Sequence, residues 1–180
     1  MNGLIRTALA SGFIRRALTG AALCGMPLLA GCGFHLRGGQ TLPYSSLYID
    51  APPTSTFALQ MKRIIGNSSQ TRVATVAQEA DAILQVQGEA REKEILSLSG
   101  AGRVREYQLR YRLTYRVLDG KNIELVPSSQ LLLRRDISFS DDAALAKESE
   151  EALLFRDMQS DAVQQLMRRL AAAPAVAAAK

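Results

Sequence analysis

A thiol at position 32 carries the clearest chemistry in this sequence of 180 residues. Cys32 directly follows Leu29, Ala30 and Gly31, and this tetrad is the pattern at which bacteria attach lipid to a cysteine. Its small residues let a membrane enzyme reach the thiol, which is the nucleophile that accepts diacylglycerol. We therefore predict lipidation at Cys32 and cleavage just before it. A soluble signal peptide cut nearby is the alternative.

The residues before Cys32 have the zones of an export signal. Arg6, Arg15 and Arg16 precede an apolar run over residues 17–30 that contains no charge. This run is too short to span a bilayer, which needs about 20 apolar residues. We predict a signal peptide over 1–31 and a lipidated tether over 32–43, where three glycines and Pro43 favour an irregular chain. Because a cysteine with several acyl chains is held essentially permanently, the mature chain is expected to stay on a membrane.

Composition of the mature chain excludes several classes of protein. Removal of residues 1–31 takes away three arginines and no acid, so the formal charge falls from +5 to +2. Nucleic-acid binding requires a concentrated basic face, so the composition of the mature chain no longer indicates it. Cys24 leaves with the signal and Cys32 is acylated, so neither a disulfide nor a thiolate metal site is expected. The remaining length suits one domain with a single core.

Hydrophobic periodicity in the mature chain predicts two amphipathic helices and four strands. One helix begins at a cap on Thr54 or Ser55 and stops at Gly66-Asn67, and the other runs from a cap on Asp141 or Asp142 to about Leu170. A weak extended pattern near 72–76 is not counted as a strand, and the tail over 171–180 is expected to be disordered. The predicted strands cover 46–51, 82–91 and 104–119, and a last strand over 123–126 and 130–139 continues the meander, with an edge or bulge at Pro127.

Alternation along the strands defines one apolar sheet face. The first long strand places Ala82, Leu84, Val86, Gly88 and Ala90 together, and the next places Tyr107 to Val117 together at every second position. Stacking both helices on that face gives an α+β two-layer sandwich over 44–170, with a mainly antiparallel four-stranded sheet. The opposite face carries Arg110, Arg112 and Arg116. From spacing alone this face meets either water or an anionic partner, and water is the commoner case.

Catalytic chemistry has little support. The single histidine, His35, lies in the tether and is poorly placed to act as the base of a nucleophile. Neither a metal site nor a cofactor is predicted. Gly100-Ala101-Gly102 has no lysine or serine behind it and lies between two strands, so it is a hairpin tip, not a phosphate-binding loop.

Three cations lie near the predicted loops. Arg103 and Arg105 follow the glycine-rich hairpin tip, and Lys147 lies close to the start of the last helix. Exposed loop cations are usually solvated, although such groups also contact phosphates. They are therefore candidates for binding an anionic ligand.

Three motifs together resemble the LptE family of lipopolysaccharide-assembly lipoproteins. They are Cys32-Gly33-Phe34-His35-Leu36-Arg37-Gly38, Glu106-Tyr107-Gln108 and Ala144-Leu145-Ala146-Lys147. The resemblance implies a two-helix, four-strand sandwich seated inside the outer-membrane barrel LptD, in a translocon that delivers lipopolysaccharide to the cell surface. It implies no enzymatic turnover. Resemblance to other lipoproteins, with Gly33 and not an aspartate after Cys32, implies the periplasmic side of the outer membrane.

The family resemblance also suggests site residues. Family members are thought to bind lipopolysaccharide through a lysine that matches Lys147 and an arginine in the hairpin, where this sequence has Gly100 with Arg103 nearby. We predict Arg103, Arg105 and Lys147 as lipopolysaccharide contacts, because basic groups can replace the cations that bridge its phosphates. The face with Arg110, Arg112 and Arg116 would then meet the polar lumen of LptD.

Two other classes of protein compete with this interpretation. A stand-alone lipid-binding or scaffold lipoprotein on the periplasmic side of the membrane would need no barrel partner, and a tethered hydrolase would need a better-placed base than His35. A lipid carrier would bind amphiphiles in an apolar cavity, whereas here the apolar sheet face is needed to cover the helices.

Overall fold

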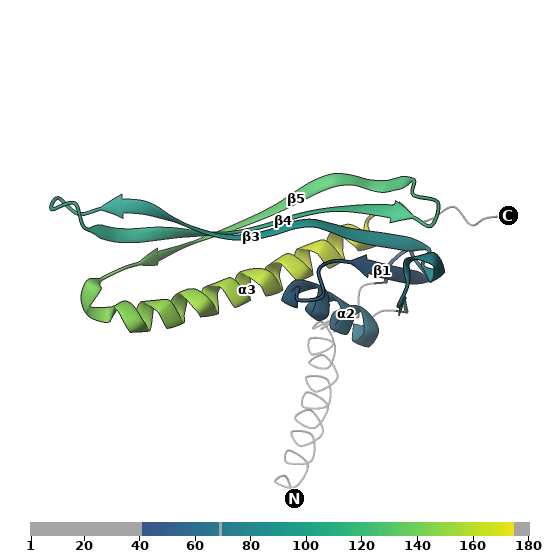
Figure 1. Ribbon diagram of the computed structural model, residues 1–180, viewed down its shortest axis with the longest axis horizontal. Coiled ribbons are helices and arrows are strands. Elements are labelled where there is room, and N and C mark those ends of the chain that lie inside the picture. Colours follow the sequence, from purple (N-terminus) through teal and green to yellow (C-terminus); the bar gives the residue numbers. More distant parts are fainter. Residues whose placement is uncertain (1–40, 69, 175–180) are drawn as a thin grey trace, which may run out of the picture. The chain divides into compact units, whose positions relative to one another are not determined.

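The computed structural model describes residues 41–68 and 70–174 of the chain (Figure 1). The predicted signal peptide, the lipidation site at Cys32, most of the tether and the tail over 175–180 lie outside the described residues. Those assignments, including the division of the chain into segments, stay predictions.

The described residues form one sheet with two helices on one of its faces (Figure 1). The helices are α2 (Thr56–Ser68) and α3 (Ala144–Ala171), with short 3-10 turns η2 (Ala77–Glu79) and η3 (Asp141–Ala143). The strands are β1 (Ser46–Asp50), β2 (Arg72–Val73), β3 (Ala82–Leu98), β4 (Val104–Asp119) and β5 (Glu124–Ser138), in the spatial order β2-β1-β3-β4-β5. This confirms the predicted α+β sandwich.

The number of strands differs from the prediction. The sheet has five strands because the weak extended piece forms β2, which pairs in parallel with β1 through Ser46 with Arg72 and Leu47 with Val73. A strand of two residues has no alternation from which it could be detected. β1 is also parallel to β3, whereas β3, β4 and β5 form an antiparallel meander.

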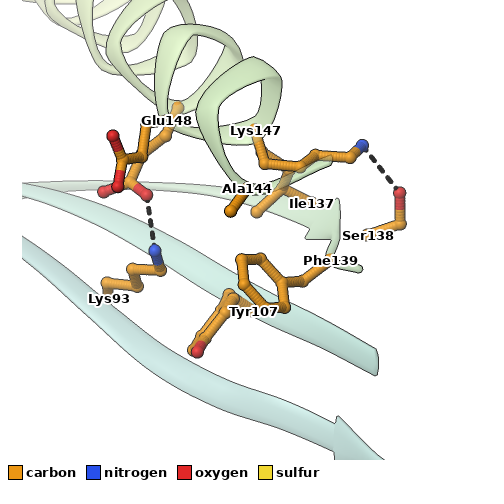
Figure 2. A pocket seen from close by; sticks show the side chains of 9 residues that line it. Lys93, Tyr107, Ile137, Ser138, Phe139, Ala144, Lys147 and Glu148 are labelled. Carbon is orange, nitrogen blue, oxygen red and sulfur yellow. Dashed lines mark hydrogen bonds and ion pairs between the residues drawn. The ribbon is translucent and has the colours of Figure 1, made fainter. Parts of the chain in front are cut away.

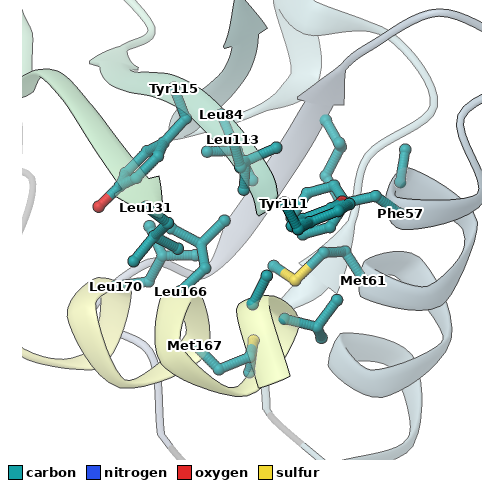
Figure 3. Packing of buried hydrophobic residues seen from close by; sticks show 14 of the residues in the cluster. Phe57, Met61, Leu84, Tyr111, Leu113, Tyr115, Leu131, Leu166, Met167 and Leu170 are labelled. Carbon is teal, nitrogen blue, oxygen red and sulfur yellow. The ribbon is translucent and has the colours of Figure 1, made fainter. Parts of the chain in front are cut away.

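The core lies between β4 and the helices, as the alternation along β4 predicts. Leu109, Tyr111, Leu113, Tyr115 and Val117 are all at most 1% exposed and belong to one core cluster. Figure 3 shows Tyr111, Leu113 and Tyr115 packed against side chains of the helices. α3 supplies a buried stripe from Phe155 to Leu170, and α2 supplies Phe57, Met61 and Ile65. Each fully buried side chain of this size contributes about 1.5–3 kcal/mol, so this layer fixes how the helices lie on the sheet.

A β-bulge in β3 overturns part of the predicted alternation. The register shifts between Val86 and Gly88, after which Gly88 pairs with Thr114 and Glu89 with Leu113. Directly opposed residues of an antiparallel pair share a face. Gly88 and Ala90, predicted on the apolar face, therefore lie on the outer face. The charged residues Glu89, Arg91 and Lys93 instead turn toward the helices, each opposite a buried residue of β4.

The helix starts confirm one predicted cap and correct another. The Ser55 hydroxyl accepts a hydrogen bond from the Ala58 amide at 3.2 Å and caps α2, which continues past the predicted stop at Gly66 to Ser68. Asp141 and Asp142 do not cap α3, because they lie in the 3-10 turn η3. α3 begins at Ala144 without a side-chain cap.

Asp119 organises the turn between β4 and β5. The Asp119 carboxylate accepts hydrogen bonds from the amides of Lys121 and Ile123, both at 2.8 Å, while Asn122 adopts a φ of 63°. Pro127 lies in edge strand β5 where the register with β4 shifts, as a residue without an amide proton requires.

Candidate functional site

The three predicted lipopolysaccharide contacts gather at one end of the described fold. Arg103 and Arg105 lie at the β3–β4 hairpin tip, and Lys147 lies in the first turn of α3, which begins at the same end of the sheet (Figure 1). The amide of Phe139 donates to the Arg105 carbonyl at 2.7 Å, and Lys147 donates to the hydroxyl of the adjacent Ser138 at 3.0 Å. The chain after β5 therefore connects Lys147 with Arg105.

Lys147 borders a cavity of about 190 Å³ between the start of α3 and the sheet (Figure 2). Tyr107 and Phe139 form its aromatic wall, with ring centroids 5.3 Å apart and planes at 79°. The Lys147 ammonium also lies 2.9 Å from Glu150, one turn further along α3. The Glu150 carboxylate therefore partly compensates the positive charge of Lys147. An anionic ligand would have to displace Glu150 to interact with the full charge of the Lys147 ammonium.

Lys93 is a residue of this site that the sequence pattern did not reveal. Its ammonium lies 4.3 Å from the centre of the Tyr107 ring and 2.6 Å from the Glu151 carboxylate (Figure 2). It thereby links β3 to the first part of α3. The bulge turns Lys93 inward, and Gly88 was the available signal, since a glycine inside a strand often marks a bulge.

Arg103 and Arg105 are exposed, and their side chains make no hydrogen bond or ion pair within residues 41–68 and 70–174. Only backbone contacts hold them, including the Arg103 carbonyl that accepts from Ser99 at 2.7 Å. Their guanidinium groups are therefore available to an anion without the loss of an existing ion pair. Guanidinium groups bind phosphate oxygens with two parallel hydrogen bonds, which suits this chemistry.

The predicted barrel-facing arginines lie on the other side of the sheet, but that face is not bare or basic. Each arginine side chain is compensated by a carboxylate on a neighbouring strand. The ion pairs are Arg110–Glu94 at 2.6 Å, Arg112–Glu92 at 2.9 Å and Arg116–Glu124 at 3.6 Å. The bulge explains two of them, because it moves Glu92 and Glu94 onto the outer face. A solvated face of mixed charge results.

A polar cluster ties β3 and β4 to the start of α2. The Glu89 carboxylate accepts from the Tyr111 hydroxyl at 2.8 Å and from the Ser55 hydroxyl at 3.1 Å. Burial raises the pKa of the Tyr111 hydroxyl far above its ordinary 10.0, and the hydrogen bond to Glu89 raises it further. These hydrogen bonds connect the bulged part of β3 to Ser55, which caps α2, so the cluster stabilises the fold.

Metal binding and membrane crossing are two further questions for the part of the chain that is described. No group of three or more His, Cys, Asp and Glu side chains that could hold a metal ion occurs there. No helix among these residues is both long and apolar enough to cross a membrane.

Comparison with known proteins shows the family. The profile of the LptE family, described as lipopolysaccharide-assembly, matches residues 44–170, which span all five strands, α2 and all of α3 except its last residue. The chain belongs to the LptE family. It is 30% identical over 149 residues to the LPS-assembly lipoprotein LptE of Pectobacterium atrosepticum, covering 79% of this chain and 78% of that protein. It is 29% identical over 155 residues to LptE of Yersinia enterocolitica, covering 82% and 73%.

Solved structures agree with this assignment. The NMR structure of an uncharacterized lipoprotein B from Nitrosomonas europaea has a TM-score of 0.68 and 43% identity, covering 78% of this chain and 91% of that one. The crystal structure of rare lipoprotein B from Shewanella oneidensis, at 22% identity, has a TM-score of 0.59 and covers 71% and 94%; it shows the shared fold alone. The resemblance drawn from three LptE motifs is confirmed, and the family is named for lipopolysaccharide assembly.

Proposed function

We propose that this LptE-family chain is an outer-membrane lipoprotein, anchored through Cys32 on the periplasmic side, that takes part in lipopolysaccharide transport to the cell surface. In this proposal it forms a 1:1 complex with the barrel protein LptD and binds lipopolysaccharide through basic residues. The observation that carries the proposal is the match of the family over residues 44–170. Its relatives are named as lipoproteins of lipopolysaccharide assembly.

The lipopolysaccharide contact would lie at the end with Arg103, Arg105 and Lys147. Lipopolysaccharide aggregates through its acyl chains and through cations that bridge its phosphates. Arginines without a carboxylate partner can take the place of those cations and help to separate single molecules. Lys147, held by Ser138 and Glu150, would add a third positive charge at the same end.

Charge reversal tests this contact. The triple variant Arg103→Glu, Arg105→Glu, Lys147→Glu in the full chain should bind lipopolysaccharide at least about ten-fold more weakly than the unaltered chain. Arg63→Glu, Lys121→Glu and Arg168→Glu together form the control, since they are exposed and change the net charge equally. Equal binding by both triple variants would show that net charge, and not this site, attracts the ligand.

The outer sheet face would contact the lumen of LptD. A domain enclosed by a barrel needs a polar surface against a polar lumen. The ion pairs of Arg110, Arg112 and Arg116 give such a surface, polar but internally compensated. Depletion of the chain in its host should leave LptD misassembled, whereas normal LptD assembly after depletion would contradict this role.

A further inference from the structure

The hairpin end of β3 and β4 exposes an unusual group of aliphatic side chains. Ile95 is 57% exposed, Leu96 is 47% exposed and Leu98 is 55% exposed, all within four residues of β3. Leu145, in the first turn of α3 at the same end, is 81% exposed. Single exposed aliphatic residues are ordinary, whereas three within four residues of one strand make an apolar hairpin end that is suited to contact something other than water.

The same segment has no charge of its own. No charged residue occurs between Glu94 and Arg103, although this stretch forms an exposed end of β3 where the strand pairs only with β4. Free strand edges in water usually carry charged residues that prevent aggregation. An apolar contact made by this hairpin end would explain why it carries no charged residue.

The two arginines of the candidate site, whose side chains have no ion-pair partner in the described part of the chain, lie in the same hairpin as this apolar group. Leu98 pairs with Val104, which Arg103 and Arg105 flank in the sequence. The pairing brings aliphatic and cationic residues to the same hairpin end. An open hollow at this end, lined by Leu98 and Arg105 among others, combines the two chemistries.

We propose that the hairpin end over 95–105 contacts the acyl chains of the lipopolysaccharide molecule whose phosphates Arg103 and Arg105 bind. The inference rests on the proposed function and adds a second, apolar half to that site. Aliphatic side chains beside cations match a phosphorylated, acylated glycolipid, in which both kinds of group belong to one molecule. A free phosphate would leave the aliphatic group without a partner.

Photo-crosslinking in cells tests the position of the contact. A photoreactive amino acid is placed in the full chain at Ile95, Leu98 or Lys147, and at Ile123 as a control that is 60% exposed at the opposite, β4–β5 turn. We expect lipopolysaccharide adducts at Ile95 and Leu98 and not at Ile123. Adducts at Lys147 alone would overturn this inference while leaving the proposed function intact. Adducts to a protein alone at Ile95 and Leu98 would mean that a partner covers the hairpin, and would also overturn it.

Binding to intact and deacylated ligand tests the chemistry. The variant Ile95→Ser, Leu96→Ser, Leu98→Ser should bind intact lipopolysaccharide at least about ten-fold more weakly, because about half of each aliphatic side chain loses its apolar contact. Its binding to fully deacylated lipopolysaccharide, which keeps the phosphates, should not change. Leu59→Ser, Val76→Ser and Leu153→Ser together, at positions exposed to 55%, 44% and 52%, are the matched control. Unchanged binding of intact ligand by the hairpin variant would refute the inference, whereas no binding by the unaltered chain would refute the proposed function itself.

Discussion

Replacement of Tyr111 by phenylalanine removes a single hydroxyl from the polar cluster beneath the bulge of β3. Tyr111 is fully buried, and its hydroxyl donates to the Glu89 carboxylate at 2.8 Å. The same carboxylate accepts from Ser55, which caps α2 through the Ala58 amide. Tyr111→Phe therefore leaves a charged acceptor with one partner fewer, while the shape of the core stays the same.

The expected cost follows from the type of bond. A hydrogen bond to a charged group contributes about 1.5–3 kcal/mol, and the lower value applies here because Glu89 is only half-buried. For a mature chain of this size, about 1.5 kcal/mol lowers the melting temperature by about 3–6 °C. Urea unfolding of the full chain measures the free energy. Tyr48→Phe is the control, since the Tyr48 hydroxyl has no partner among the described residues.

Alkaline pH tests the environment of the same hydroxyl, whose pKa is raised first by burial and then by the hydrogen bond to Glu89. The pKa of Tyr111 is raised in the fold, so above pH 10 the unfolded chain releases this proton while the folded chain keeps it. The stabilisation is therefore complete below pH 10 and is lost as the pH rises above 10. The loss amounts to about 1.4 kcal/mol per pH unit from this one group. Tyr111→Phe should decline less steeply than the unaltered protein over this range.

A double-mutant cycle decides whether the hydroxyl acts through Glu89. In a Glu89→Ala background the cost of Tyr111→Phe should disappear or change sign, because the acceptor is gone and the buried hydroxyl is left without this partner. An equal cost in both backgrounds, or an unchanged slope above pH 10, would refute the reasoning.

Three further variants test other parts of the fold by urea unfolding of the full chain. Tyr44→Phe should raise the free energy of unfolding by about 1 kcal/mol, because within the described residues the buried Tyr44 hydroxyl has no hydrogen-bond partner; a loss of stability would show that it has one. Met158→Ala should lower it by about 2–5 kcal/mol through the cavity left in the core, and a cost below 1 kcal/mol would mean that α3 is not fixed there. Lys93→Gln should lower it by about 1 kcal/mol or less, with a smaller effect in high salt, since the pair with Glu151 is partly exposed; a salt-independent cost would point to packing instead.

The fold was predictable wherever one periodic pattern ran without interruption. β4 alternates over its whole length, so both its buried face and its arginines were assigned correctly. The stripe on α3 was equally readable from Phe155 to Leu170. Such patterns reflect burial against a single surface, which is the same physical cause that forms the elements.

The errors came from features that break the period. The bulge at Gly88 reverses the two faces of β3, and alternation by itself cannot show where a residue has been inserted. Because of this one shift, the sequence pattern could predict neither the inward position of Lys93 nor the ion pairs of Arg110 and Arg112. The start of α3 was misplaced because the 3-10 turn η3 absorbs the acidic residues that would otherwise cap a helix. Within the candidate site, cations could be found by type, whereas the cavity beside Lys147 depends on the bulge and on the return of the chain after β5.

The mass of the native complex tests the central claim most directly. The full chain is purified from outer membranes of its host in mild detergent, and the mass and composition of the particle are measured. We predict one copy of the chain with one copy of a large β-barrel protein, and an acylated cysteine as the first residue of the chain. A chain that emerges alone, or with an unmodified N-terminus, would contradict this account.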